Sequence, residues 1–460
     1  MYESDARSFR DRRADLKISF RKIPGSICAP RGFKCASVFC DIKKLGTGKG
    51  SEKGRKDDLA LIISDVPAVV AGMFTRNQVC AAPAKVSRQR AKKNFARAIV
   101  VNSGNANAAT GSQGMRDAEA MTRLTADAVA AVYDPRKSKE TALIERRYRR
   151  ISATDVLVCS TGRIGVAMPM KNIERGIRAC APRIARSTSN ARKVAEAIMT
   201  TDTRRKEIAV EFKIGKSTVR MGGICKGAGM IQPGMATMLA FITTDAVIDP
   251  ASLNRALKIA VGQSFNRITV DGDMSTNDSV IVLANGLAKN SKSEIRNSKF
   301  QSALNFVCLE LAKMIVRDGE GTSRFIALHV GGAPNDREAE IAARSIANSS
   351  LVRTSWCGGD PNWGRILCAL GYSKASVDET KVDVGYAAPD KRKILFAFRH
   401  GRPTNVALKD LAKISSAPEF DLHIDLHLGR GAFTLYAADL TENYVMFNKG
   451  DVNDPTTLGG

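Results

Sequence analysis

The chain alternates short apolar runs with segments in which apolar residues recur at helical spacing. Leu59–Ser64, Ala68–Phe74 and Val156–Cys159 have the length and composition of buried strands. Asp249 followed by Pro250 is typical of a helix start, because aspartate caps the first turn and proline fits it. The alternation predicts a mixed α/β protein, and the glycine fingerprint of a Rossmann fold is missing. Further strands are expected at 98–102, 208–214, 218–221, 279–283 and mostly from 394 onward, and helices at 117–132, 173–187, 191–199, 250–261, 300–316 and 338–347.

The length of the chain and its net charge limit the classes of protein to which it can belong. With 460 residues the chain can form two or three domains, or one large layered domain. The net charge of +25 suits a nucleic-acid binder, a salt-adapted surface or an enzyme for anionic substrates. Much of the excess lies in basic insertions at 46–58 and 134–150, which are typical of solvated loops. Aromatic residues make up only 6% and no nucleic-acid-binding module is found, so we expect no nucleic-acid partner.

The cysteine pattern and the hydropathy of the chain indicate in which cellular compartment the protein is expected. The ten cysteines are scattered without a Cys-x-x-Cys pair, so neither a zinc site nor a redox dithiol is indicated, and a reducing compartment fits best. No apolar run is long enough to span a bilayer and no signal-peptide pattern is found. We therefore expect a cytoplasmic protein without a membrane partner. Residues 1–25 are arginine-rich but interrupted by acids, and an organelle matrix is the alternative if they form a transit peptide.

The stretch from Lys226 to Asp245 stands out. A basic residue opens a glycine-rich loop, Pro233-Gly234 predicts a turn, and Thr237 lies where the loop becomes an apolar strand. Such a position can hold a hydroxyl rigidly in a cleft. The residues alone nevertheless favour an ordinary β-branched residue at the start of a core strand.

Two further segments could carry chemistry. Ser160–Gly165 follows a strand as a small-residue turn, which can aim backbone N–H groups at a developing oxyanion or can be a plain tight turn, the commoner case. Glu320 stands between two glycines and can reach a ligand, although a solvated loop glutamate is the default interpretation.

A metal site is a third candidate. Strand spacing places Asp421, His423, Asp425 and His427 on one face, and two histidines with a carboxylate can ligate a metal. A solvated sheet face is the favoured interpretation, so we expect no metal.

Eight segments together resemble the ornithine acetyltransferase family, also called ArgJ. The segment Lys226–Asp245 is similar to the family signature Lys-Gly-Ser-Gly-Met-Ile-x-Pro-Asn-Met-Ala-Thr-Met-Leu. One such motif would be weak evidence, but these occur in order from about residue 31 to the C-terminus. The other seven are Ser64–Val69, Val101–Ala108, Ser160–Gly165, Ile198–Thr203, Ser264–Asp273, Val316–Gly321 and Pro361–Ile366.

The resemblance implies a layered α-β-β-α sandwich of the ArgJ/DmpA-like type, made as a self-cleaving precursor. Cleavage between Ala236 and Thr237 would divide the chain into an N-terminal extension (1–30), an α chain (31–236) and a β chain (237–460). The two chains would stay together as an α2β2 heterotetramer.

The resemblance also implies a reaction. Thr237, with its new α-amine as base, would take the acetyl group from N2-acetyl-L-ornithine and pass it to L-glutamate by ping-pong kinetics, in arginine biosynthesis and without a cofactor. Whether acetyl-CoA also serves as donor stays open. Thr161 and Gly162 would form the oxyanion hole, Lys226 would pair with the substrate α-carboxylate, and Glu320 with the ornithine ammonium. The substrate-binding positions are Thr200, Lys226, Thr237, Glu320, Asn448 and Asn453.

This sequence departs from the family pattern at several positions. Ala228 replaces serine and Gly234 replaces asparagine near the scissile bond, Arg205 replaces a common proline, and Asn453 stands where threonine or serine is usual. Two alternative functions stay open. One is an N-terminal-nucleophile amidohydrolase or aminopeptidase, in which water replaces glutamate, and the other is a basic nucleic-acid-binding protein without enzymatic activity.

Overall fold

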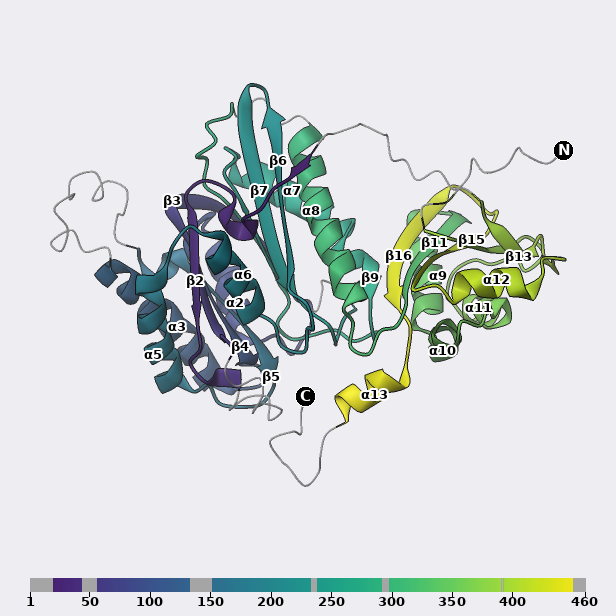
Figure 1. The fold of residues 1–460 in the computed structure, drawn as a ribbon, viewed down its shortest axis with the longest axis horizontal. Helices are drawn as coiled ribbons and strands as arrows, with labels where there is room; N and C mark the ends of the chain where they lie inside the picture. Colours follow the sequence, from purple (N-terminus) through teal and green to yellow (C-terminus); the bar gives the residue numbers. More distant parts are fainter. Residues whose placement is uncertain are drawn as a thin grey trace.

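The computed structural model describes residues 20–43, 56–132, 151–232, 238–291, 298–389, 391 and 393–449. Within these residues the chain forms two β-sheets, each covered by helices (Figure 1). The α/β class predicted from the sequence is confirmed. None of the helices in the described ranges combines the length and apolarity needed to cross a membrane.

The first sheet joins segments from both sides of the glycine-rich loop. Its nine strands, counted over the described residues, run in the order β1-β6-β7-β8-β10-β3-β4-β5, with β2 beside β3. Strand β8, which follows the loop, is antiparallel to β7 and parallel to β10. The strands predicted at 208–214 and 218–221 form a hairpin, β6 and β7, which turns at Gly215-Lys216. The strands are β1 (Arg21–Lys22), β2 (Phe33–Val38), β3 (Leu59–Phe74), β4 (Phe95–Asn105), β5 (Val156–Arg163), β6 (Lys206–Ile214), β7 (Ser217–Lys226), β8 (Leu239–Thr244) and β10 (Ser279–Ala284).

Strand β3 is bent and belongs to both halves of the first sheet. Its first part pairs with β2 from Leu59 to Ser64, and its last part pairs with β10 from Val69 to Phe74. Between them the register with β4 shifts, at a stretch that contains Pro67. Proline has no backbone N–H to give to a ladder, so it favours such an interruption. The two predicted strands are therefore one long, bent strand.

The bend folds the sheet into two facing layers. One apolar cluster lies between them and joins side chains of β2–β5 to those of β7, β8 and β10. The outer face of the β2–β5 layer is covered by α3 and α5, and the outer face of the other layer by α7 and α8. Helix, sheet, sheet and helix thus follow one another, as the predicted α-β-β-α sandwich requires. The helices are α2 (Ala82–Ala91), α3 (Gly111–Val132), α5 (Met170–Cys180), α6 (Thr188–Ala197), α7 (Pro250–Gly262) and α8 (Ser298–Arg317), with 3-10 turns at Ser26–Cys28, Ala153–Asp155, Ala181–Arg183 and Phe265–Arg267.

The second sheet was not anticipated from the sequence. Seven strands of the described chain take the order β14-β13-β12-β15-β11-β16-β9. One face packs against α9 to α12, and the other places Phe325 and Tyr436 in the cluster formed by α8, so α8 lies between the two sheets (Figure 1). The elements are β9 (Ile268–Thr269), β11 (Phe325–Ala333), α9 (Asp336–Asn348), α10 (Ser350–Gly358), α11 (Trp363–Gly371), β12 (Asp383–Ala387), β13 (Leu395–Arg399), β14 (Arg402–Pro403), α12 (Leu408–Ser415), β15 (Glu419–Asp425), β16 (Gly431–Ala438) and α13 (Glu442–Asn448).

Two predicted elements were wrong in extent. The helix expected at 173–187 is shorter, because α5 ends at Cys180 and Pro182 follows within a 3-10 turn. Proline cannot continue the α-helical hydrogen-bond ladder. The region from Ile394 onward contains β13 to β16, as predicted, but also the helices α12 and α13, which were not predicted.

Candidate active site

A buried network of opposite charges lies beside the end of β7. The ammonium group of Lys206 on β6 contacts the carboxylates of Asp202 at 2.6 Å and Asp318 at 2.5 Å. Asp318 also accepts hydrogen bonds from the backbone N–H groups of Thr203 (3.1 Å) and Arg204 (3.2 Å). Because Asp318 follows α8 and Asp202 precedes β6, the network ties these segments together around the last residues of β7.

Electrostatics keep this network charged. Burial raises the pKa of Asp202, but the ammonium groups of Lys206 and Lys226 outweigh that effect and hold the pKa well below its ordinary value. Burial lowers the pKa of Lys206, and its two carboxylate partners more than compensate, so its pKa is raised. Lys226, the last residue of β7, therefore lies next to a permanent negative charge.

Glu320 is held in the interior, contrary to the default expectation of a solvated loop glutamate. Its backbone N–H donates to the carbonyl of Ala228 at 2.9 Å, and the residue is only 9% exposed. A Cβ placed on Gly229 would lie 2.4 Å from the Glu320 carboxylate, so a larger residue there would displace that side chain. The side-chain amide of Asn448 on α13 donates to Glu320 Oε2 at 2.9 Å. The glycine-rich loop, Glu320 and Asn448 thus meet in one place.

Thr200 joins the same region through Asp202. Its backbone N–H donates to Asp202 Oδ2 at 3.1 Å, and the N–H of Gly227 donates to Oδ1 of the same carboxylate at 2.7 Å. A cavity of about 330 Å³ opens against Thr200 and Asp202, and its wall carries the side chains of three lysines, Lys43, Lys56 and Lys193. The same wall carries three acids, Asp57, Glu196 and Asp202, so the formal charges of the lining balance.

Thr161 and Gly162 lie within a strand rather than in the predicted turn. Strand β5 continues to Arg163, and Gly162 pairs with Gly104 across an irregular register with β4. Gly162 has a φ of 129°, and a Cβ there would come within 2.3 Å of the Gly104 backbone. The turn predicted at Ser160–Gly165 is therefore wrong for Thr161 and Gly162.

Asn277 and Asp278 connect that strand to the start of β8. The amide of Asn277 donates to the carbonyls of Ser160 (2.9 Å) and Ala106 (2.6 Å). Asp278 Oδ1 accepts the backbone N–H of Met238 at 2.9 Å, while its Oδ2 makes no hydrogen bond with the residues that the structure describes. Complete burial raises the pKa of Asp278 well above its ordinary value. In the sequence Met238 directly follows Thr237, so the hydrogen bond to Asp278 is made by the residue next to the predicted nucleophile.

The predicted site residues are therefore placed in two groups. Thr200, Lys226, Glu320 and Asn448 are linked through Asp202 and the glycine-rich loop, whereas Thr161 and Gly162 are linked to Met238 through Asn277-Asp278. Ala236, Thr237 and Asn453 lie outside the described residues. The sequence analysis did not identify Asp202, Lys206, Asp278 and Asp318 as site residues. Asp202 and Asp318 stand inside two of the eight motifs, which was the available signal.

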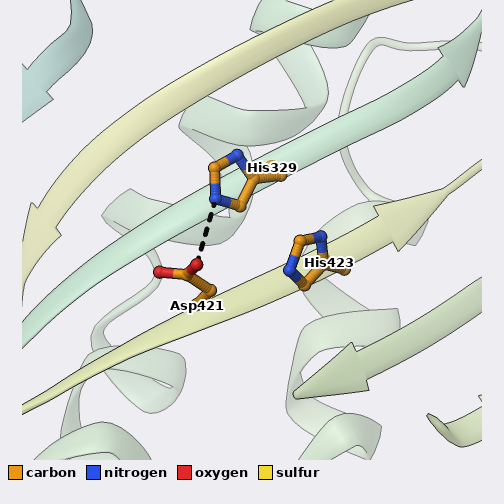
Figure 2. A group of neighbouring side chains, drawn as sticks. All are labelled: His329, Asp421 and His423. Atoms are coloured by element: carbon orange, nitrogen blue, oxygen red, sulfur yellow. Dashed lines mark ion pairs between the residues drawn. The ribbon is translucent and has the colours of Figure 1, made fainter. Parts of the chain in front are cut away.

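The four side chains proposed to share a strand face do not stay together. His427 lies beyond the end of β15 with a φ of 50°, and its Nε2 is 3.1 Å from Asp383 Oδ2. Asp421 and His423 remain on one face of β15, where they meet His329 of β11 instead (Figure 2). Burial, with the neighbouring His329, lowers the pKa of His423 to about 4.

Comparisons with known proteins agree with this arrangement of motifs. The sequence profile of the ArgJ family matches residues 44–450. The chain is similar to the arginine biosynthesis bifunctional protein ArgJ of Symbiobacterium thermophilum, with 43% identity over 93% of this chain and 98% of the relative. It is also similar to the glutamate N-acetyltransferase of Methanocaldococcus jannaschii, with 42% identity over 93% of this chain and 98% of the relative.

A solved structure is similar as well. It is the arginine biosynthesis bifunctional protein ArgJ from Bacillus halodurans, with 41% identity and a TM-score of 0.43 over 46% of this chain and 99% of that chain. The profile match and the two relatives each span most of the chain. The chain therefore belongs to the ArgJ family.

Proposed function

We propose that this protein transfers an acetyl group from N2-acetyl-L-ornithine to L-glutamate in arginine biosynthesis. The observation that carries the proposal is that Asp202 and the glycine-rich loop link Thr200, Lys226, Glu320 and Asn448, which come from four distant parts of the chain. Relatives that carry ArgJ and glutamate N-acetyltransferase names align with this chain over nearly their whole length, which supports acyl transfer.

The proposed reaction begins with processing of the chain. The hydroxyl of Thr237 attacks the carbonyl carbon of Ala236, the peptide C–N bond breaks, and the nitrogen of Thr237 takes up a proton. Water then hydrolyses the resulting ester, which leaves Ala236 as a carboxylate and Thr237 with a free α-amine. Such an amine titrates near pH ~8, so part of it is neutral at working pH and can serve as base for the hydroxyl.

Acetyl transfer follows in two steps. Thr237 attacks the acetyl carbonyl of N2-acetyl-L-ornithine, the C–N bond of the amide breaks, and the proton removed from the hydroxyl passes to the departing ornithine amine. The amine of glutamate then attacks the acetyl ester, the C–O bond between the acetyl carbon and Thr237 breaks, and the proton lost by the amine passes to the Thr237 oxygen and restores its hydroxyl. Backbone donors at Thr161 and Gly162 would stabilise the oxyanion in both steps, and loss of one such donor typically costs ~3 kcal/mol of barrier.

The charges at the site fit an amino-acid substrate. Lys226 would pair with the α-carboxylate, and the buried carboxylate of Glu320, oriented by Asn448, would hold the ornithine ammonium. Neither role requires a cofactor. We further propose that the α and β chains stay together as α2β2. Strand β8 supports the first part of this assembly, because it lies between β7 and β10 and would hold the two chains in one sheet.

A transfer assay tests this function. Purified protein is incubated with N2-acetyl-L-ornithine, with and without L-glutamate, and free ornithine and N-acetylglutamate are measured. The proposal expects the two products in equal amounts, and little ornithine when glutamate is omitted. Ornithine release at the same rate without glutamate would identify a hydrolase instead. A parallel assay with acetyl-CoA and glutamate determines whether that donor is also used.

A further inference from the structure

All four histidines of the chain lie on the second sheet or at its edge, and none of them takes part in the reaction proposed above. Two of them, His329 on β11 and His423 on β15, stand directly opposite each other in the parallel register of these strands. Asp421 precedes His423 by two residues and therefore shares its face of β15. Their neighbours Phe420, Leu422 and Ile424 point the other way, into the cluster that contacts α9 to α12.

The three side chains point toward one another (Figure 2). One ligand atom from each of them lies within 4.8 Å of the other two. His329 Nε2 is 3.8 Å from Asp421 Oδ2, and the two imidazole rings are stacked with centroids 4.8 Å apart and an interplanar angle of 19°. On the other side of the His329 ring, Nδ1 is 3.1 Å from the hydroxyl of Thr434.

We propose that His329, Asp421 and His423 form a binding site for a divalent transition-metal ion of the Zn²⁺ type. Two imidazole nitrogens and one carboxylate oxygen are a ligand set that zinc accepts, with a fourth position left for water. Zinc–ligand bonds of ~2.0–2.2 Å place the ligand atoms about 3.4 Å apart, so side-chain rotation must shorten the longest separation by roughly 1.4 Å. Thr434 would accept the Nδ1–H of His329 and so direct Nε2 to the metal, as partners of ligating histidines commonly do.

A bound ion would connect two neighbouring strands of the second sheet. The ligands come from β11 and β15, which are already paired, so the metal would stabilise an existing arrangement rather than create one. We therefore assign the site a structural role that is independent of acetyl transfer.

The chain contains a second group of similar composition, which serves as the matched control. Asp383, His400 and His427 also bring two histidines to one carboxylate. There, however, the guanidinium of Arg399 lies 3.7 Å from Asp383 Oδ2, and Oδ1 accepts the backbone N–H of His400 at 2.8 Å. A cation already at this carboxylate repels a metal ion, so we expect this second group to bind zinc poorly.

The test uses the full-length protein without an affinity tag, stripped of metal with a chelator. Isothermal titration with ZnCl₂ should show one site, MgCl₂ should show none, and Zn²⁺ should raise the melting temperature. His329→Gln and His423→Gln should each weaken zinc binding at least about tenfold. The His400→Gln/His427→Gln variant should bind zinc like the wild type.

Circular dichroism of the metal-free variants checks that each is folded, and Co²⁺ substitution adds a spectroscopic readout. The visible absorption of the bound Co²⁺ should disappear in His329→Gln and His423→Gln alone. The proposal is overturned if the wild type binds no zinc, or if folded His329→Gln and His423→Gln bind zinc as the wild type does.

Discussion

The carboxylate of Asp278 accepts the backbone N–H of Met238 at 2.9 Å, and Met238 is the residue that follows Thr237. Since β8 begins one residue later, at Leu239, this hydrogen bond fixes the point at which the chain enters the sheet. A buried acid that touches the backbone beside the predicted nucleophile is expected to position it.

Substitution of Asp278 should affect processing through this hydrogen bond. Burial raises the pKa of Asp278, so the neutral acid is favoured and asparagine is a close mimic of it. We expect Asp278→Asn to be cleaved within about threefold of the wild-type rate. Asp278→Ala leaves the Met238 N–H without its acceptor, a loss of about 1–3 kcal/mol that corresponds to roughly five- to 150-fold slower cleavage.

Intact-mass measurements over time after synthesis record both rates. Asp127→Ala, at an exposed position on α3, is the control and should be cleaved like the wild type. Equal cleavage of the Asp278→Ala variant would exclude a positioning role for this carboxylate.

The raised pKa of Asp278 also predicts a pH dependence of stability. Between the ordinary aspartate pKa of about 4 and the raised native value, the folded state holds a proton that the unfolded state has released. The unfolded state therefore binds fewer protons, and the free energy of unfolding falls as the pH rises through this window. Asp278→Asn should lack this fall. Urea unfolding between pH 4 and 8, with Thr237→Ala in both proteins to keep a single species, measures the difference, and parallel curves would contradict the prediction.

Lys206 should be essential for the fold around the site. Lys206→Met leaves Asp202 and Asp318 as buried carboxylates without their shared cation, and removal of one partner from a buried ion pair typically costs about 3–5 kcal/mol. Denaturant unfolding measures this loss. Lys216→Met, in the exposed turn between β6 and β7, is the matched control and should change the free energy of unfolding little. Similar stabilities for the two variants would show that the network contributes nothing.

Gly229 should report on the role of Glu320. In Gly229→Ala the new methyl group would occupy space 2.4 Å from the Glu320 carboxylate and displace it, so the KM for N2-acetyl-L-ornithine should rise at least about tenfold. Gly262 at the end of α7 has nothing within 4 Å of an added Cβ, so Gly262→Ala should leave KM unchanged. An unaltered KM in Gly229→Ala, with the protein folded, would remove Glu320 from substrate binding.

Local signals in the sequence predicted local structure well. Asp249 does cap α7, since its side chain accepts the N–H of Ser252 at 2.9 Å, and α8 extends only slightly beyond the predicted 300–316. The second sheet could not be predicted in the same way. It pairs β11 with β15, about a hundred residues later, and no local pattern encodes such a pairing.

Residues of the candidate site could be predicted only where they lie in a segment that resembles the family. Lys226, Glu320 and Asn448 followed from resemblance, whereas Lys206 and Asp202 look like an ordinary exposed pair four residues apart. Only the fold shows that both are buried and that Asp318, 112 residues away, completes their network. For the same reason His329 was not linked to Asp421 and His423.

The most direct test of the account is intact-mass analysis and N-terminal sequencing of the purified protein. We predict two chains, with the second beginning at Thr237, and a single uncleaved chain in Thr237→Ala that has no transferase activity. A single uncleaved wild-type chain with full transferase activity would contradict the proposed mechanism.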